Sequence, residues 1–137
     1  MRVEFDKSLA TGNAMIDEQH KELIGKIDKL LTCCEQGGEK IQAIKMLDYL
    51  AEYTEFHFGE EEKLQKEVSY PGIEEHKKQH AEFKKAVDVL HEMLIEEEGP
   101  SEAFVTAVKK NVVAWLFDHI KNMDQALASY VQTEVNK

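Results

Sequence analysis

The stretch IEEHKKQHAEFKKAVDVLHEMLIEEE, residues 73–98, has the clearest helical periodicity in the chain and decides the fold. Its apolar side chains fall on one helical face: Ile73, Phe83, Val87, Leu90 and Leu94. Gly99 and Pro100 follow at once and end the helix. A helix of this length with a single apolar stripe has to bury that stripe against other helices.

Three further segments carry stripes of the same period and are separated by turn residues. The first stripe stops at Gly37-Gly38, residues 68–72 form a turn cluster, and Ser101 offers an N-cap to the last segment. We therefore expect an arm at about 1–15 and helices at about 16–36, 40–66, 73–98 and 101–131. Because the links are short, neighbouring helices should run antiparallel. The prediction is an all-α, up-down-up-down antiparallel four-helix bundle with an N-terminal extended arm, in one domain spanning residues 1–137.

Composition limits the range of partners. The chain has 137 residues and a formal net charge of −10 at pH 7. Nucleic acid and anionic membrane surfaces would repel such a protein, so neither is an expected partner, and the acidity favours a monomer. No apolar run approaches the ~20 residues of a membrane span. Residues 1–15 lack the apolar core of a secretory signal, so we expect a cytoplasmic protein.

Imidazoles and carboxylates fall on the apolar stripes, where they need a partner. They come from all four predicted helices: His20, then His57 and Glu61, then His76 and His80, and finally His119 and Asp124. His57/Glu61 and His76/His80 are i,i+4 pairs, so the members of each pair are offset by only ~40°. A single histidine on such a stripe is usually a hydrogen-bonded core residue. Five histidines spread over four helices instead indicate a shared metal site.

Asp124 follows His119 by five residues, which is an offset of ~140° in a regular α-helix. Either its side chain reaches around the helix, or the helix widens locally to i→i+5 hydrogen bonding, a feature common at functional sites. We predict such a widening between His119 and Asp124.

Other polar residues have simpler interpretations. His91 has no other ligand type beside it and should face solvent near the end of its helix. Glu60 and Glu62 point away from the buried stripe and should be solvated. The adjacent Cys33 and Cys34 are unsuited to a relaxed disulfide with each other and should be small residues near a helix end.

The ligand set predicts two metal ions rather than one. Imidazole suits iron, copper, zinc and nickel, whereas carboxylates favour iron or manganese. Seven side chains exceed what one ion takes from a protein, but the two carboxylates can bridge a pair of ions. Two octahedral ions offer about twelve positions, of which about eleven are filled by the imidazoles, the bridging carboxylates and a bridging oxo or hydroxo group. One position therefore stays open.

A single vacancy suits one diatomic ligand but not dioxygen together with a substrate. Two carboxylates also stabilise high-valent iron poorly, so bound oxygen should leave again rather than be split. The sequence thus predicts reversible dioxygen binding at two non-haem iron ions and no enzymatic activity. By helical spacing, four apolar side chains are candidates to shield the open position from water, although each also suits plain core packing: Leu23, Phe58, Trp115 and Ile120.

Four motifs resemble the signature of the hemerythrin family in its bacterial form. They are DEQHK at 17–21, HFGEE at 57–61, HKKQH at 76–80 and HIKNMD at 119–124. The resemblance covers essentially the whole chain and implies a four-helix bundle with a non-haem di-iron centre that binds dioxygen reversibly. It implies that His76, His80 and His119 bind the coordinatively filled iron. It also implies that His20 and His57 bind the iron with the vacancy, while Glu61 and Asp124 bridge the two.

Members of this family act as oxygen carriers or stores, and others are sensors fused to signalling modules. Since this sequence shows no second domain, we favour a stand-alone carrier or store that supplies oxygen to oxygen-consuming enzymes. Four alternatives stay open. They are a di-iron enzyme such as a peroxidase or oxidase, a sensor of oxygen or nitric oxide, an iron-handling protein, and a structural bundle without metal.

Overall fold

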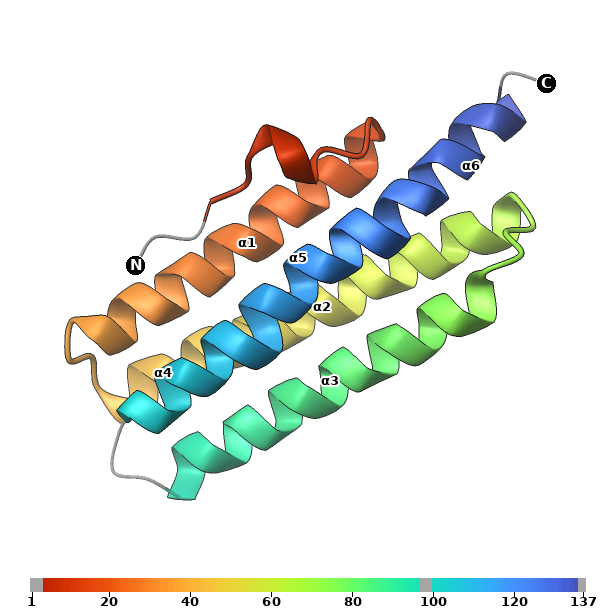
Figure 1. The fold of residues 1–137 in the computed structure, drawn as a ribbon. Helices are drawn as coiled ribbons and strands as arrows, with labels where there is room; N and C mark the ends of the chain where they lie inside the picture. The colour runs from red at the N-terminus through yellow and green to blue at the C-terminus, as the bar shows by residue number, and fades with distance from the viewer. Residues whose placement is uncertain (1–3, 97–99, 136–137) are drawn as a thin grey trace.

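The computed structural model describes residues 4–96 and 100–135. Three uninterrupted helices, α1 (Ala14–Glu35), α2 (Lys40–Glu67) and α3 (Ile73–Glu96), pack beside a fourth helical stretch (Figure 1). The fourth stretch consists of α4 (Glu102–Val108), η2 (Lys109–Ala114), α5 (Trp115–His119), η3 (Ile120–Asp124) and α6 (Gln125–Val135). Its segments η2 and η3 are π-helical and leave the helix continuous. The predicted all-α, antiparallel four-helix bundle is confirmed.

Successive helices run in opposite directions, and the fourth stretch closes the bundle against α1 and α3. The helix ends differ from the predicted ones by a few residues. α1 begins at Ala14 rather than 16, because the Asn13 side chain accepts a hydrogen bond from the Ile16 amide at 3.0 Å and caps the helix there. The last helix continues to Val135 rather than 131. The expected end of the third helix at 98 lies outside the described residues.

The links between helices use the turn chemistry that the sequence indicates. α1 ends where Gly37 adopts a φ of 73°, a left-handed conformation that glycine reaches without strain. Glu39 and Gln42 then form a capping box that starts α2. Ser101 caps α4 as predicted, since its hydroxyl accepts the Phe104 amide at 3.0 Å. These caps fix where each helix begins, and therefore which residues face inward.

Apolar side chains from α1, α2, α3 and the fourth stretch form one core, and buried polar residues interrupt it. His20 lies early in α1, His57 late in α2 and His76 early in α3. Because adjacent helices are antiparallel, these positions meet at the same level of the bundle. His119 and Asp124 reach that level from the later part of the fourth stretch.

The N-terminal arm is docked and is only partly extended. It contains one turn of 3₁₀ helix, η1 (Lys7–Leu9), and Leu9 is completely buried. The Asp17 carboxylate accepts hydrogen bonds from the Thr11 amide and hydroxyl at 2.9 and 2.8 Å and from the Gly12 amide at 3.2 Å. The arm is thus fixed to the first turn of α1, close to His20 in sequence.

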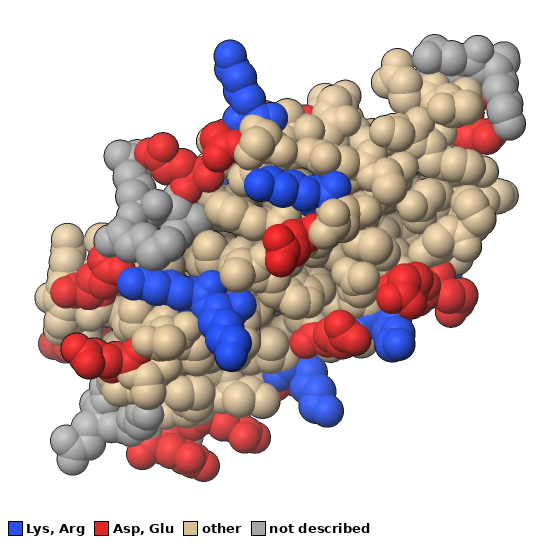
Figure 2. All heavy atoms as spheres, viewed as in Figure 1, with Lys and Arg blue, Asp and Glu red and all other residues tan. Residues whose placement is uncertain are grey.

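Figure 2 shows that lysine and arginine side chains are scattered among the more numerous acidic ones on the face it displays. This distribution agrees with the composition, because the chain has 27 acidic residues and only 17 lysine and arginine residues. Among the helices in the described ranges, none is both long enough and apolar enough to cross a membrane.

Candidate metal centre

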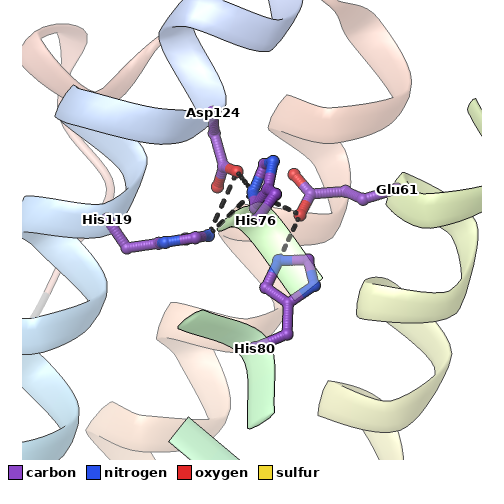
Figure 3. Close-up of side chains that lie close together, drawn as sticks. All are labelled: Glu61, His76, His80, His119 and Asp124. Atoms are coloured by element: carbon purple, nitrogen blue, oxygen red, sulfur yellow. Dashed lines mark hydrogen bonds and ion pairs between the residues drawn. The ribbon is translucent and has the colours of Figure 1, made fainter. Parts of the chain in front are cut away.

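The predicted ligands converge in the interior of the bundle. All seven are at most 3% exposed, although each is a polar or charged side chain. Figure 3 shows five of them pointing toward one another from α2, α3, α5 and η3. The full set comprises His20 of α1, His57 and Glu61 of α2, His76 and His80 of α3, His119 of α5 and Asp124 of η3.

These side chains form two overlapping groups. In each group, one potential ligand atom per residue lies within 4.8 Å of all the others. The three-histidine group contains His76, His80 and His119, and the two-histidine group contains His20 and His57. Glu61 and Asp124 belong to both groups. The arrangement therefore offers two adjacent cation positions that share two carboxylates.

The oxygens of Asp124 divide between the two groups. Its Oδ1 lies 2.8 Å from His76 Nε2 and 3.3 Å from His119 Nε2, whereas its Oδ2 lies 2.8 Å from His20 Nε2. Each oxygen thus faces a different cation position. This is the placement that a carboxylate bridging two ions requires.

Glu61 is placed in a similar way. Its Oε1 is 3.1 Å from His80 Nε2 and 3.7 Å from His76 Nε2, while its Oε2 is 4.0 Å from His20 Nε2. His57 Nε2 also approaches Oε1, at 3.7 Å. Both carboxylates therefore lie between the two groups.

A local widening of the helix brings Asp124 to the centre. Residues Ile120–Asp124 form the π-helical segment η3 directly after His119. A π-helical turn contains more residues than an α-helical one, so a residue five positions after His119 returns to the same helical face. The widening predicted between His119 and Asp124 is confirmed.

Several atoms of the centre lack the partners that buried polar atoms need. Among the described residues, no hydrogen bond of acceptable geometry reaches Nε2 of His20, His57 or His80, either oxygen of Glu61, or Oδ2 of Asp124. Leaving such atoms unpaired in a buried site costs about 1–3 kcal/mol each. All of them face the shared interior of the two groups. Cations bound there would satisfy them together, so the residues fit a metal pair.

The pKa values of two imidazoles leave them ready to bind a cation. Burial lowers the pKa of His57 to about 3, helped by the nearby ring of His20. Burial also lowers the pKa of His80 to about 2, helped by His76. Both rings are therefore neutral at pH 7, which is the form in which an imidazole nitrogen binds a metal.

The two carboxylates have opposite shifts. Burial raises the pKa of Glu61 well above its ordinary value, and the charge of Asp124 adds to this effect. Burial acts in the same direction on Asp124, but contacts with His119, His20 and His76 outweigh it and hold its pKa well below the usual range. The buried centre thus favours the protonated form of Glu61 and the ionised form of Asp124. A cation pair would allow both carboxylates to ionise.

Four side chains missed by the sequence analysis bind the outer nitrogens of the histidines. Gln19 Oε1 lies 2.8 Å from His57 Nδ1, and Gln79 Oε1 lies 2.9 Å from His119 Nδ1. A histidine that binds a metal through Nε2 carries its proton on Nδ1, so an oxygen is the acceptor required there. These contacts direct Nε2 of both rings into the centre.

Glu62 was expected to be solvated, and that expectation is wrong. Its Oε2 lies 3.0 Å from His80 Nδ1, and its side chain is only 27% exposed. The fourth partner is Gln65, whose amide nitrogen lies 2.6 Å from His76 Nδ1 while its Oε1 has no hydrogen-bond partner among the described residues. Rotating this amide by half a turn places the oxygen on the Nδ1–H that a metal-bound His76 presents.

Aromatic rings pack directly on the ligands. Phe58 stacks on His80, and Trp115 stacks on His119 with centroids 4.6 Å apart and planes 12° from parallel. Leu23 and Ile120, the other predicted shielding residues, are completely buried in the core. Their position next to the open metal site stays a prediction.

Residues expected to lie outside the centre do so. The His91 side chain is 37% exposed, its Nε2 lies 3.2 Å from Asp48 Oδ1, and it belongs to neither ligand group. Cys33 and Cys34 are free thiols, partly buried at the end of α1. Burial raises the pKa of Cys34 to about 11, so its thiol stays protonated and unreactive at neutral pH.

The fold and the centre together define a class of protein: a four-helix bundle whose core carries a histidine-rich site able to hold two cations. The chain belongs to the hemerythrin family, because the family model described as "Hemerythrin HHE cation binding domain" matches residues 11–131. The resemblance seen in the four motifs is thereby confirmed.

Curated relatives extend over nearly the whole chain. Bacteriohemerythrin of Stenotrophomonas maltophilia is 30% identical over 133 residues, which are 97% of this chain and 84% of the relative. Bacteriohemerythrin of Aquifex aeolicus is 29% identical over 129 residues, covering 93% of this chain and 96% of the relative. Bacteriohemerythrin of Campylobacter jejuni is 26% identical over 133 residues, covering 96% and 97%.

Proposed function

We propose that the chain binds dioxygen reversibly at two non-haem iron ions joined by a bridging oxo or hydroxo group. In this role it transports or stores oxygen, or delivers it to oxygen-consuming enzymes. The observation that carries the proposal is the division of seven buried ligands into two groups that share both carboxylates. Membership of the hemerythrin family supports the same assignment.

The unequal number of histidines supports a single vacancy. His76, His80 and His119 would hold one iron, and His20 and His57 the other, with Glu61 and Asp124 bridging. The two-histidine position has one protein ligand fewer, so it is the position at which a small exogenous ligand would bind. A ferrous pair held there would supply the two electrons that dioxygen accepts on binding.

The protein around the centre restricts competing chemistry. Phe58, Leu23 and Ile120 are completely buried, and the ligands are nearly inaccessible to solvent. Exclusion of water slows irreversible oxidation, and the burial of the ligands hinders access by a second substrate. These features favour binding and release over turnover.

The test is an oxygenation cycle. Metal-free protein is loaded with Fe(II) without air, its iron content is measured, and it is then exposed to dioxygen and returned to vacuum. We expect about two irons per chain, a visible absorption band that appears in air, and loss of that band under vacuum. A His91→Ala variant serves as the control. Because His91 lies outside both groups, this variant should bind and release dioxygen like the native chain.

The other outcomes distinguish the alternatives. Permanent oxidation on first exposure overturns the proposal. Steady consumption of oxygen or peroxide with an electron donor, well above the rate of autoxidation, indicates an enzyme instead. Many irons per chain indicate iron storage.

A further inference from the structure

The two ligand groups differ in how firmly their histidines are held. In the three-histidine group, every ring has a partner within 3.0 Å of Nδ1: Gln65 on His76, Glu62 on His80 and Gln79 on His119. In the two-histidine group, Gln19 holds His57. No described residue forms a hydrogen bond with Nδ1 of His20.

Such partners change how well a histidine binds metal. Hydrogen bonding at Nδ1 fixes the tautomer and the ring orientation and makes Nε2 a stronger donor, and removal of the partner typically costs about 10–100-fold in metal affinity. Hydrogen bonds to a carboxylate are also about twice as strong as those between neutral groups. Among the four partners, only Glu62 offers a carboxylate, whereas the other three are amides.

His80 is consequently the most constrained ligand of the centre. The Glu62 carboxylate lies 3.0 Å from His80 Nδ1. The rings of Phe58 and His80 are nearly parallel, with their centroids 3.7 Å apart. His80 Nε2 then lies 3.1 Å from Glu61 Oε1. Little conformational freedom is left for a bound ion to remove, so the entropic cost of binding at this position is low.

We propose that the three-histidine group takes up the first metal ion, and that Glu62 is the positioning residue that sets the affinity of this step. The two-histidine group fills second, because His20 lacks the hydrogen-bond partner at Nδ1 that supports every ring of the three-histidine group. The inference rests on the metal pair of the proposed function, but it makes no use of dioxygen.

The experiment is a titration of metal-free protein with Co²⁺, followed by visible absorption and by native mass spectrometry. The native chain should accumulate a one-ion complex before the two-ion complex appears. Glu62→Ala should weaken the first step by about 10–100-fold. Glu62→Gln, which keeps an acceptor oxygen but loses the charge, should recover part of that loss. Gln19→Ala should weaken the second step and leave the first unchanged.

Glu82→Gln and Glu82→Ala are the matched controls, because Glu82 is exposed on α3 two residues after His80 and is not a member of either ligand group. Both should bind Co²⁺ like the native chain. Far-ultraviolet circular dichroism of each metal-free variant separates lost ligand support from lost folding. Should Glu62→Ala be unfolded without metal, the comparison of Glu62→Gln with Glu82→Gln decides.

Uptake of two ions with a first affinity in Glu62→Ala within about threefold of the native value overturns this inference alone. The inference is also overturned if Glu62→Gln loses as much first-step affinity as Glu62→Ala does. It is overturned as well if the native chain takes up both ions without forming a one-ion complex. Failure of the native chain to bind any metal overturns both this inference and the proposed function.

Discussion

The ring of Phe58 lies flat against the imidazole of His80, with centroids 3.7 Å apart and planes within 3° of parallel. His80 also has its Nδ1 fixed by Glu62. Stacking sets the plane of the ring, and the hydrogen bond sets its rotation within that plane. Together they fix the direction of Nε2 without any contribution from a metal. The protein therefore supplies two independent contacts that hold the His80 ring in one orientation.

Replacement of Phe58 should destabilise the protein and expose the centre. Phe58 is completely buried, so Phe58→Ala should lower the free energy of unfolding by about 3–5 kcal/mol through lost burial and the cavity left behind. Water admitted beside His80 should also accelerate oxidation of the iron-loaded form. Urea unfolding of the metal-free protein and the rate of autoxidation measure the two effects. Phe56→Ala is the control, because Phe56 is 51% exposed two residues away and should change stability by no more than about 0.5 kcal/mol.

Loss of one histidine of the three-histidine group should remove the iron. His76 is completely buried and its Nε2 lies 2.8 Å from Asp124 Oδ1, so His76→Ala removes a predicted ligand and one of the three histidine contacts of a shared carboxylate. Iron content should fall below one ion per chain, and the rise in Tm that iron gives the native protein should disappear. Inductively coupled plasma analysis and thermal melting test this. A His76→Ala protein with two irons and an unchanged Tm shift would mean that the centre is not a metal site.

Acidification below pH 6.5 should weaken the metal-free protein. In the unfolded chain, histidines take up protons below their ordinary pKa of 6.5. In the folded protein, the pKa of His57 is about 3 and that of His80 about 2, so both rings stay neutral down to those pH values. Each therefore removes up to about 1.4 kcal/mol of stability per pH unit as the pH falls below 6.5. Glu61 acts in the opposite direction, because its raised pKa lets the folded state keep a proton that the unfolded chain releases. The two contributions partly cancel, so the net loss should be smaller than the roughly 2.8 kcal/mol per pH unit that the two imidazoles would give alone.

Urea unfolding of the metal-free protein at several pH values measures this slope. A His57→Gln variant removes one of the two depressed imidazoles, so its slope should be shallower by about one proton. Equal stability of the native chain at pH 7 and pH 5 would contradict the assigned protonation states.

Helical periodicity was sufficient to predict the bundle and the inward-facing ligands, because burial and spacing alone determine which residues share a face. The spacing between His119 and Asp124 also predicted the π-helical turn. In a regular α-helix the Asp124 carboxylate would face away from the centre, and a widened turn brings it back. The other π-helical segment, Lys109–Ala114, was not predicted. It carries no residue of the centre, so no misplaced side chain revealed it.

The residues that hold the ligands were not predictable in the same way. Glu62 adjoins Glu61 and is rotated by ~100° from the buried stripe, so spacing placed it in solvent. Only the packing of α3 against α2 brings His80 Nδ1 to its carboxylate. Gln19 likewise adjoins His20 in sequence, but its side chain hydrogen-bonds to His57 on another helix. Contacts between helices depend on interhelical packing, which a single periodicity does not contain.

The N-terminal arm should stabilise the π-helical turn that carries Asp124. Leu9 is completely buried where η1 contacts η3, and Gln125, directly after Asp124, donates its side-chain amide to the Ser8 carbonyl at 3.0 Å. Leu9→Ala should therefore cost about 2–5 kcal/mol of stability, and Gln125→Ala about 1 kcal/mol.

In both variants the arm should be cleaved faster by a protease of broad specificity, because its backbone would leave the bundle surface more often. Limited proteolysis with mass spectrometry locates the cuts. Gln132→Ala, an exposed change on the same helix α6, should leave the cleavage rate unchanged. An arm cut no faster in Leu9→Ala than in Gln132→Ala would show that the buried leucine does not hold it. Faster cleavage together with faster metal loss would link the arm to the position of Asp124, because the arm and Gln125 meet at the turn that aims this carboxylate at both cation positions.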